Sequence, residues 1–387
     1  MLSQLSNLSN QNTTEVIFYT GLFILPFIFL PGYQPAFEVP RVIFLFFWVE
    51  LLTLSIVISK QSISLKSLQL KLILFLFATA LISSLVGVNF YKSIIGNYYR
   101  LDGILTLIHL ITLSLISTSV FSRDGLSKTI KVLYYSGFIV SFLVSLKYLI
   151  SLTYLQIDLL KLIDGNFFGN PNFLAGYLLV TFVLSLEALK NKLSKIDIVY
   201  FLLILISLLE TESQSAIALF IFTIISLILS QTFKVNTVRV FLLFIAMFIA
   251  LFIYKVNAAY DPQHPFESRV RIFEKSVLAF YEKPFLGWGW ANFDMAFESV
   301  DWPLKFERDV YVDKAHSSIM EYLVTTGIVG LFSFIILSFN TIKILFNKNT
   351  RYALIAFILL LVHAQTNIIS ITNEVYYWLL VGYTSTE

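Results

Sequence analysis

The chain has 387 residues, of which 57% are hydrophobic and only 13% are charged, and its mean hydropathy is +0.81. This composition excludes a soluble globular domain, because so much apolar surface needs lipid to cover it. The net charge of +3 comes from scattered loop lysines, which gives no indication of nucleic-acid binding, and the absence of cysteine excludes disulfides, thiolate metal sites and thiol nucleophiles.

The long apolar runs predict an all-α integral membrane protein, because a spanning helix satisfies its backbone hydrogen bonds within its own segment. The first fourteen residues are polar and lack a basic region, which predicts a tail at 1–14 rather than a cleaved signal peptide. Runs of about 17 to 25 apolar residues then predict about twelve transmembrane helices. These lie at 15–31, 42–59, 70–87, 103–120, 132–153, 172–189, 196–211, 215–231, 240–254, 316–340, 352–368 and 371–384.

The spans divide the chain into helices 1–9 at 15–254, a polar loop at 255–315, and helices 10–12 at 316–387. Basic loops stay in the cytoplasm. With a cytoplasmic N-terminus, fourteen Lys and Arg residues fall in cytoplasmic connections and four in the short opposite loops. The bias predicts that 1–14 is a cytoplasmic tail and that 255–315 is an external subdomain. No solenoid repeat is visible.

Polar residues gather on this predicted outer side, in segments 95–103, 165–175, 210–215 and the large loop. Each segment adjoins the end of a span. Asn170 followed by Pro171 and Asn172 is typical of a helix start, with the first asparagine as cap. The simplest interpretation of these asparagines is a capped membrane helix, and the alternative is contact with a substrate.

Within the large loop, apolar residues at 270, 273, 277 and 280 or 281 have helical spacing. They predict a helix that lies on the bundle or at the membrane interface. Pro284 ends it, and an aromatic turn with Trp288 and Trp290 follows. Such tryptophans are more often interfacial anchors than sugar-stacking platforms, and both interpretations stay open here.

Six short motifs occur in a fixed order along the chain. They are Tyr99-Arg100-Leu101-Asp102-Gly103, Gly169-Asn170-Pro171-Asn172-Phe173-Leu174-Ala175, Thr211-Glu212-Ser213-Gln214-Ser215-Ala216, Arg269-Val270-Arg271-Ile272-Phe273, Pro284-Phe285-Leu286-Gly287-Trp288-Gly289, and His316-Ser317-Ser318 through Gly327-Ile328-Val329-Gly330. Together with the large loop between spans nine and ten, this order resembles the O-antigen ligase and O-antigen polymerase family of bacterial envelope glycosyltransferases. The resemblance covers nearly the whole chain.

The resemblance implies a GT-C-like membrane enzyme in the bacterial cytoplasmic, or inner, membrane, with its large loop on the external or periplasmic side. Such an enzyme moves a glycan from a polyprenyl diphosphate to an acceptor hydroxyl on a lipid core, a glycan or a protein. It inverts the anomeric centre and needs no metal, cofactor or nucleotide sugar. Its partners are the lipid-linked glycan, the acceptor and membrane lipids, with a role in polysaccharide or lipopolysaccharide biosynthesis.

The physical demands of this reaction suit particular residues. A diphosphate leaving group develops negative charge that guanidinium groups stabilise, and an acceptor hydroxyl needs a base such as histidine. By resemblance, His316 is the base or orients the acceptor, and Arg100 and Arg269 contact the diphosphate. Arg271 is a further candidate for binding the diphosphate, and Lys314 is a nearby cation. The alternatives are a helix-capping role for the histidine and snorkelling to lipid headgroups for the arginines.

One position departs from the family pattern, since many relatives carry arginine where this chain has Gln214. Glutamine can hydrogen-bond a phosphate or a sugar but supplies no charge. We expect Arg271 or Lys314 to replace that charge, unless this branch handles its donor differently. Gln214, Lys314, Asn170, Asn172, Trp288 and Trp290 are candidate substrate contacts.

A transporter or flippase for lipid-linked glycans is the alternative from another class. Transporters usually show internal repeats and polar sites at the membrane centre. Here the two halves do not match and the polar residues gather on one side, which favours an enzyme. A ligase, a polysaccharide polymerase and a protein O-glycosyltransferase share the same donor chemistry, so the sequence leaves these three open.

Overall fold

A computed structural model describes residues 2–30, 37–60, 68–124, 126–151, 168–188, 194–258, 269–300 and 311–386. Within these ranges the regular secondary structure is helical throughout. The longer elements are α1 (Leu2–Ile24), α2 (Glu38–Ser59), α3 (Leu68–Val86), α5 (Ile104–Asp124), α6 (Ser127–Ser151), α8 (Pro171–Ala188), α9 (Lys195–Glu210), α10 (Gln214–Thr232), α11 (Thr237–Ala258), α12 (Arg269–Glu282), α14 (Ser318–Asn347), α15 (Arg351–Thr366) and α16 (Ile371–Thr384). Short helices are η1 (Leu25–Phe27), α4 (Phe90–Ile95) and α13 (Phe293–Ser299).

Each predicted span coincides with a helix, which confirms the all-α class. Seven described helices are long and apolar enough to cross a membrane: α2, α3, α5, α6, α10, α11 and α14. Three shorter apolar segments, Thr13–Phe27, Pro171–Glu187 and Arg351–Thr366, lie in predicted spans as well. The chain is therefore a multi-pass membrane protein, and the full count of twelve spans stays a prediction.

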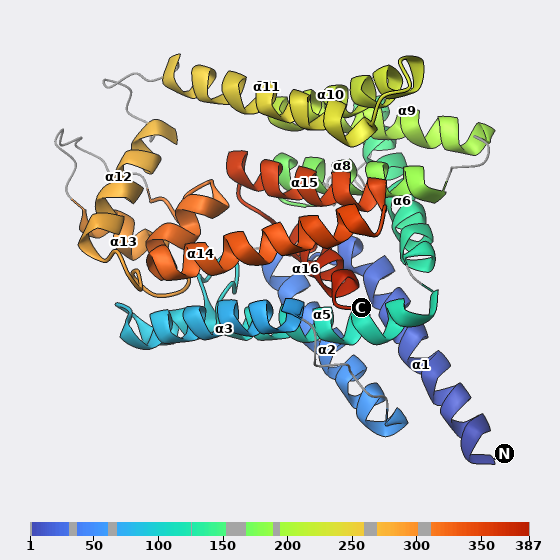
Figure 1. The fold of residues 1–387 in the computed structure, drawn as a ribbon, viewed down its shortest axis with the longest axis horizontal. Coiled ribbons are helices and arrows are strands. Elements are labelled where there is room, and N and C mark those ends of the chain that lie inside the picture. The colour runs from blue at the N-terminus through green and yellow to red at the C-terminus, as the bar shows by residue number, and fades with distance from the viewer. Residues whose placement is uncertain are drawn as a thin grey trace.

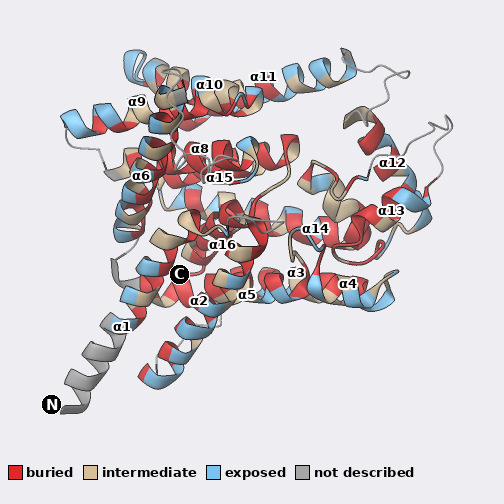
Figure 2. Cartoon of the chain, turned by 180° about the vertical axis from the view of Figure 1, so that it is seen from behind, coloured by how far each residue is buried: buried red, intermediate tan, exposed pale blue. Residues whose placement is uncertain are grey.

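The helices form a bundle whose centre is occupied by α15, α16 and α8, with α10 and α11 on one side and α3 and α5 on the other (Figure 1). Buried residues concentrate in the central helices, whereas the outer faces of α10 and α11 are largely exposed (Figure 2). Large apolar side chains such as Phe47, 68% exposed, and Leu243, 72% exposed, lie on such outer faces. Lipid covers apolar faces of this kind in a membrane protein.

The helices α12 and α13 lie together at one end of the bundle, and the N-terminus lies toward the other end (Figure 1). The predicted loop helix is confirmed as α12, but its buried face differs from the prediction. Ile272, Ser276 and Ala279 are buried, whereas Val270, Phe273 and Val277 line a groove of about 570 Å³ against α11. We call this space the apolar groove.

Helix α14 is broken at Gly327, which has φ +66° and ψ −168°, a conformation that side-chain-bearing residues rarely adopt. The break frees backbone groups that the segment 284–289 then satisfies. The amide of Ile328 donates to the carbonyl of Pro284 at 2.8 Å, and the amide of Trp288 donates to the carbonyl of Val324 at 3.0 Å. The Pro-Phe-Leu-Gly-Trp-Gly motif therefore fixes the position of the first half of α14.

The predicted orientation of the chain in the membrane can be tested directly by cysteine labelling. A cysteine replacing Ser299, which is exposed at the end of α13, should react with an impermeant maleimide in whole cells or spheroplasts. A cysteine replacing Ser127, exposed at the start of α6, should react only after the membrane is permeabilised. Because the parent chain has no cysteine, it serves as the blank. Labelling of position 127 but not 299 in intact cells would invert the topology.

Candidate active site

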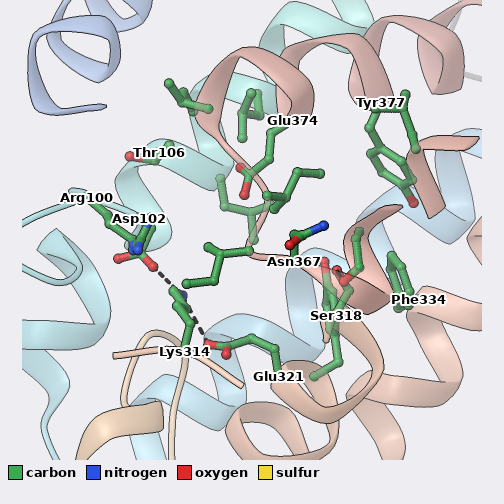
Figure 3. Close-up of a pocket in the computed structure, with 18 of the residues that line it drawn as sticks. Arg100, Asp102, Thr106, Lys314, Ser318, Glu321, Phe334, Asn367, Glu374 and Tyr377 are labelled. Carbon is green, nitrogen blue, oxygen red and sulfur yellow. Dashed lines mark hydrogen bonds and ion pairs between the residues drawn. The ribbon is translucent and has the colours of Figure 1, made fainter. Parts of the chain in front are cut away.

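An inner cavity of about 130 Å³ lies among α5, α14, α15 and α16. Its apolar wall includes Leu107, Tyr322, Leu361 and Trp378. Its polar lining comes from segments far apart in the sequence: Glu38, Arg100, Asp102, Lys314, His316, Glu321, Asn367 and Glu374. Figure 3 shows Lys314 between Asp102 and Glu321, with the side chain of Glu374 directed into the same space.

Lys314 forms ion pairs with Asp102 and, at 3.0 Å, with Glu321. Asp102 also accepts a hydrogen bond from the amide of Asn97 at 2.8 Å. Burial alone would favour the neutral forms of both groups, but the attraction between their opposite charges is the larger effect. The pKa of Asp102 therefore lies below its usual value, and the pKa of Lys314 lies well above its usual value. Lys314 is thus a fixed cation held by two carboxylates.

Arg100 and Trp290 complete one wall of the inner cavity. The Nε of Arg100 donates to a carboxylate oxygen of Asp313 at 2.7 Å, and the indole of Trp290 donates to the backbone carbonyl of Asp102 at 2.9 Å. These contacts fix both side chains within the protein. Of the two candidate tryptophans, Trp290 is therefore the one placed where a sugar could contact it.

His316 lines the inner cavity just before α14 begins, with φ at +53°. The helix cap is its neighbour: Ser317 accepts from the amide of Met320 at 3.4 Å. The hydroxyl of Ser317 also donates to Gln365 at 2.8 Å, which ties this segment to the end of α15. The capping interpretation of His316 is therefore wrong, and its imidazole makes no hydrogen bond within the described residues.

The charge state of His316 follows from its surroundings. Burial and then the positive charges of Arg269 and Arg100 lower the pKa of His316 to about 4, although Asp313 opposes them. The imidazole is therefore neutral at pH 7 and able to accept a proton. Arg269 and Arg100 are therefore both close enough to His316 to influence its protonation.

A second, lateral cavity of about 630 Å³ lies among α8, α10, α11, α12 and α15. Its apolar wall consists of Ala218, Phe222, Phe248, Leu251, Phe252 and Val256. Its polar residues are Asn172, Glu212, Ser213, Gln214, Ser215, Lys255, Arg269 and Asn367. The cavity thus combines a long apolar wall with two cations.

Arg269 and Asn367 connect the two cavities. The guanidinium of Arg269 donates to the carbonyl of Thr366 and, at 3.4 Å, to the side chain of Asn367. Asn367 lines both cavities, and its amide donates to Ser215 at 3.0 Å. The turn after α15 therefore holds the cation of the lateral cavity beside the segment that carries the histidine of the inner cavity.

Gln214 contacts a cation that the sequence did not indicate. The ammonium of Lys255, in the last turn of α11, donates to the side-chain oxygen of Gln214. Lys314 lines the inner cavity instead, and Arg271 is buried on α12 and lines neither cavity. The expectation that Arg271 or Lys314 lies at Gln214 is therefore not met in this structure.

The predicted helix start at Asn170 is present. The side chain of Asn170 accepts from the amide of Asn172 at 2.8 Å, and α8 begins at Pro171. Asn172 lines the lateral cavity and accepts from the hydroxyl of Ser213 at 2.6 Å. Ser213 is the N-cap residue of α10, yet its side chain makes no capping bond. The amides at the start of α10 thus keep their positive ends available beside Gln214.

Trp288 lies away from both cavities. It is 6% exposed, its indole donates to the carbonyl of Ala279 at 2.8 Å, and Lys283 lies 4.5 Å from its ring centre. Trp288 is therefore a core residue of the cluster that packs around α12 and α13, and it lines neither cavity.

Sequence reasoning missed Lys255, the polar turn at 365–367 and Glu374. The signal for the turn is a Gln-Thr-Asn run that ends an apolar span, and the signal for Glu374 is a carboxylate in the first turn of another span. Lys255 was counted as the first residue of the loop, and only the pairing of α10 with α11 places it at Gln214.

Comparison with known proteins gives a family match over part of the chain. No curated protein sequence matches the chain. Residues 199–335 match a family model described as O-antigen ligase. That stretch contains Gln214, Lys255, Arg269 and His316, so both cavities draw residues from it. The match over residues 199–335 supports the O-antigen ligase or O-antigen polymerase family that the sequence motifs indicate.

Proposed function

We propose that this protein transfers a glycan from a polyprenyl diphosphate to an acceptor hydroxyl on the outer face of the cytoplasmic membrane. The observation that carries the proposal is the meeting of two cavities at Asn367. One cavity is cationic with an apolar wall, and the other contains a neutral histidine. A lipid-linked donor and a hydroxylated acceptor need such a pair of adjoining sites.

The lateral cavity suits the head of the donor. A diphosphate needs cations and oriented N–H donors, and Arg269 and the start of α10 supply them. Arg269 is already positioned by Thr366 and Asn367, so little reorganisation accompanies binding. The exposed carboxylate of Glu212 also lines this cavity, and it has to turn away from a bound phosphate.

The prenyl chain has a path that continues from the lateral cavity. Phe252 and Val256 on α11 line both this cavity and the apolar groove. The groove runs on between α11 and α12 past Val270 and Phe273. An isoprenoid chain in it would cover apolar surface while its diphosphate stays beside Arg269.

The inner cavity suits the acceptor. In the proposed step, His316 removes the proton from the acceptor hydroxyl, and the oxygen forms a new bond to the anomeric carbon. The bond from that carbon to the phosphate oxygen breaks, and the electron pair leaves with the polyprenyl diphosphate. Arg269 stabilises the charge that develops on the leaving group, and attack from the face opposite it inverts the anomeric centre. The step uses no metal.

The low pKa of His316 gives the two sites a functional connection. A base with a pKa of about 4 accepts protons weakly. A diphosphate bound at Arg269 offsets one of the positive charges that depress this pKa, so donor binding raises the basicity of His316. The histidine becomes an effective base when a donor is present.

The function is tested by comparing lipid-linked glycans in cells with and without the gene. Accumulation of full-length donor in the deletion strain indicates ligation to a lipid core or to protein, and loss of long chains indicates polymerisation. Both results support glycan transfer. Retention of the lipid-linked glycan on the cytoplasmic face would indicate translocation and would contradict the proposal.

A further inference from the structure

A cation lies beside Gln214, the first residue of α10, where this helix meets the lateral cavity. Here the ammonium of Lys255 reaches the side-chain oxygen of Gln214 from the last turn of α11. The two residues are 41 positions apart in sequence and meet because α10 and α11 pack against each other. The positive charge beside the start of α10 is thus supplied by the neighbouring helix α11.

We infer that Lys255 and Gln214 together form a phosphate-binding subsite for the diphosphate of the donor, with Lys255 providing the charge. The inference rests on the proposed function and goes beyond it by assigning a residue outside the family motifs. The amide of Gln214 suits this role, because it can hold the ammonium through its oxygen and still donate a hydrogen bond from its nitrogen.

The surroundings of Lys255 favour an anion. Among the described residues the ammonium contacts no carboxylate, and its one hydrogen-bonding partner is neutral. The second cation of the cavity, Arg269, is likewise bonded to a carbonyl and an amide side chain rather than to an acid. Glu212 is the one carboxylate in the lining of this cavity that the structure describes. Two cations in that lining face one acid, and this excess of positive charge favours a ligand that brings its own negative charge.

The geometry at the start of α10 adds donors to this charge. Ser213 bonds to Asn172 at 2.6 Å instead of capping the helix, and Ser215 faces the same cavity next to Asn367. The positive end of α10 therefore opens toward the space between Lys255 and Arg269. A diphosphate there would have one cation on each side.

The test measures binding of farnesyl diphosphate to the purified full chain in lipid nanodiscs, with farnesol as the uncharged control ligand. Lys255→Ala should weaken binding of the diphosphate by about 10- to 100-fold, the usual effect of losing one charged hydrogen bond. Binding of farnesol should not change. Lys255→Arg should stay near the parent, and Lys343→Ala, at an exposed position toward the other end of α14, is the matched control.

The decisive variant moves the charge from one helix to the other. Gln214→Arg in the Lys255→Ala background should recover most of the lost affinity, because the arginine places its charge in the same cavity. Parental affinity in Lys255→Ala would overturn the inference. Equal weakness of Lys255→Ala, Lys255→Arg and the double variant would also overturn it, by showing that the lysine stem and not its charge matters.

The proposed glycan transfer and the proposed phosphate-binding subsite can each be contradicted independently of the other. If the parent chain binds farnesyl diphosphate but never transfers a glycan, the function is wrong and the subsite stands. If the parent transfers glycan and Arg269→Ala abolishes it while Lys255→Ala changes neither binding nor transfer, the function stands and the subsite is wrong.

Discussion

Replacing His316 with alanine should lower glycan transfer by about 10²- to 10⁴-fold, the range that a positioned general base contributes. Folding and donor binding should change little, because the imidazole makes no hydrogen bond within the described residues and the helix cap is Ser317. The measurement is transfer of glycan by the purified protein, with the thermal melting temperature recorded for each variant.

Two comparisons show what this histidine does. His109→Ala is the matched control, since His109 stacks on Phe46 at 4.1 Å and lines neither cavity; it should keep parental transfer. His316→Gln retains hydrogen bonding but cannot take a proton at neutral pH. Parental activity in His316→Gln would mean that the side chain only positions the acceptor, and parental activity in His316→Ala would exclude the site.

The pH profile of the parent gives an independent check. Because the pKa of His316 is lowered to about 4, the free protein keeps its base neutral well below pH 6.5. Protonation removes the base, so kcat/KM for the donor should stay level from about pH 8 to about pH 5, where an ordinary histidine of pKa about 6.5 would be mostly protonated. The fall of kcat on the acidic side should occur at a higher pH than the fall of kcat/KM, because bound diphosphate raises the pKa of His316.

Replacing Arg269 with alanine should lower transfer by about 10²- to 10³-fold, as expected for one preorganised donor at a developing negative charge. Arg269→Lys keeps the charge but loses the planar fork that reaches Thr366 and Asn367, so it should also be strongly impaired. The measurement is single-turnover transfer, which separates the chemical step from donor binding.

Arg239→Ala is the control for these two variants. Arg239 is exposed near the N-terminus of α11, whereas the lateral cavity is lined by the C-terminal half of that helix. It should transfer glycan at the parental rate. Full activity in both Arg269→Lys and Arg269→Ala would remove this arginine from the donor site, while leaving the assignment of His316 intact.

Much of the fold follows from the sequence because the apolar runs are long and uninterrupted. Every predicted span coincides with a helix. The boundaries are less accurate: Pro26 places a short 3-10 turn after α1, and α14 continues to Asn347 beyond its predicted end at 340. The glycine at 327 is a local indication of the break in α14. The pairing of this break with the segment 284–289 depends on tertiary hydrogen bonds, which no local pattern indicates.

The site was only partly predictable, because the residue type shows which chemistry a side chain can perform but not which residues it contacts in the fold. His316 and Arg269 carried a signal through their chemistry and their positions at span ends, and the structure places them on either side of Asn367. The contact between Lys255 and Gln214 arises from helix pairing, which no local pattern records. The same holds for Arg271, whose charge looked available and is buried on α12.

The most direct test is transfer by the purified full chain in proteoliposomes, given a polyprenyl diphosphate-linked glycan and a hydroxylated acceptor, with chelator present and no nucleotide sugar. We predict glycosylated acceptor with inverted anomeric configuration and stoichiometric release of polyprenyl diphosphate, both reduced together by His316→Ala and Arg269→Ala. Movement of the intact donor across the bilayer without any new glycosidic bond would contradict this function.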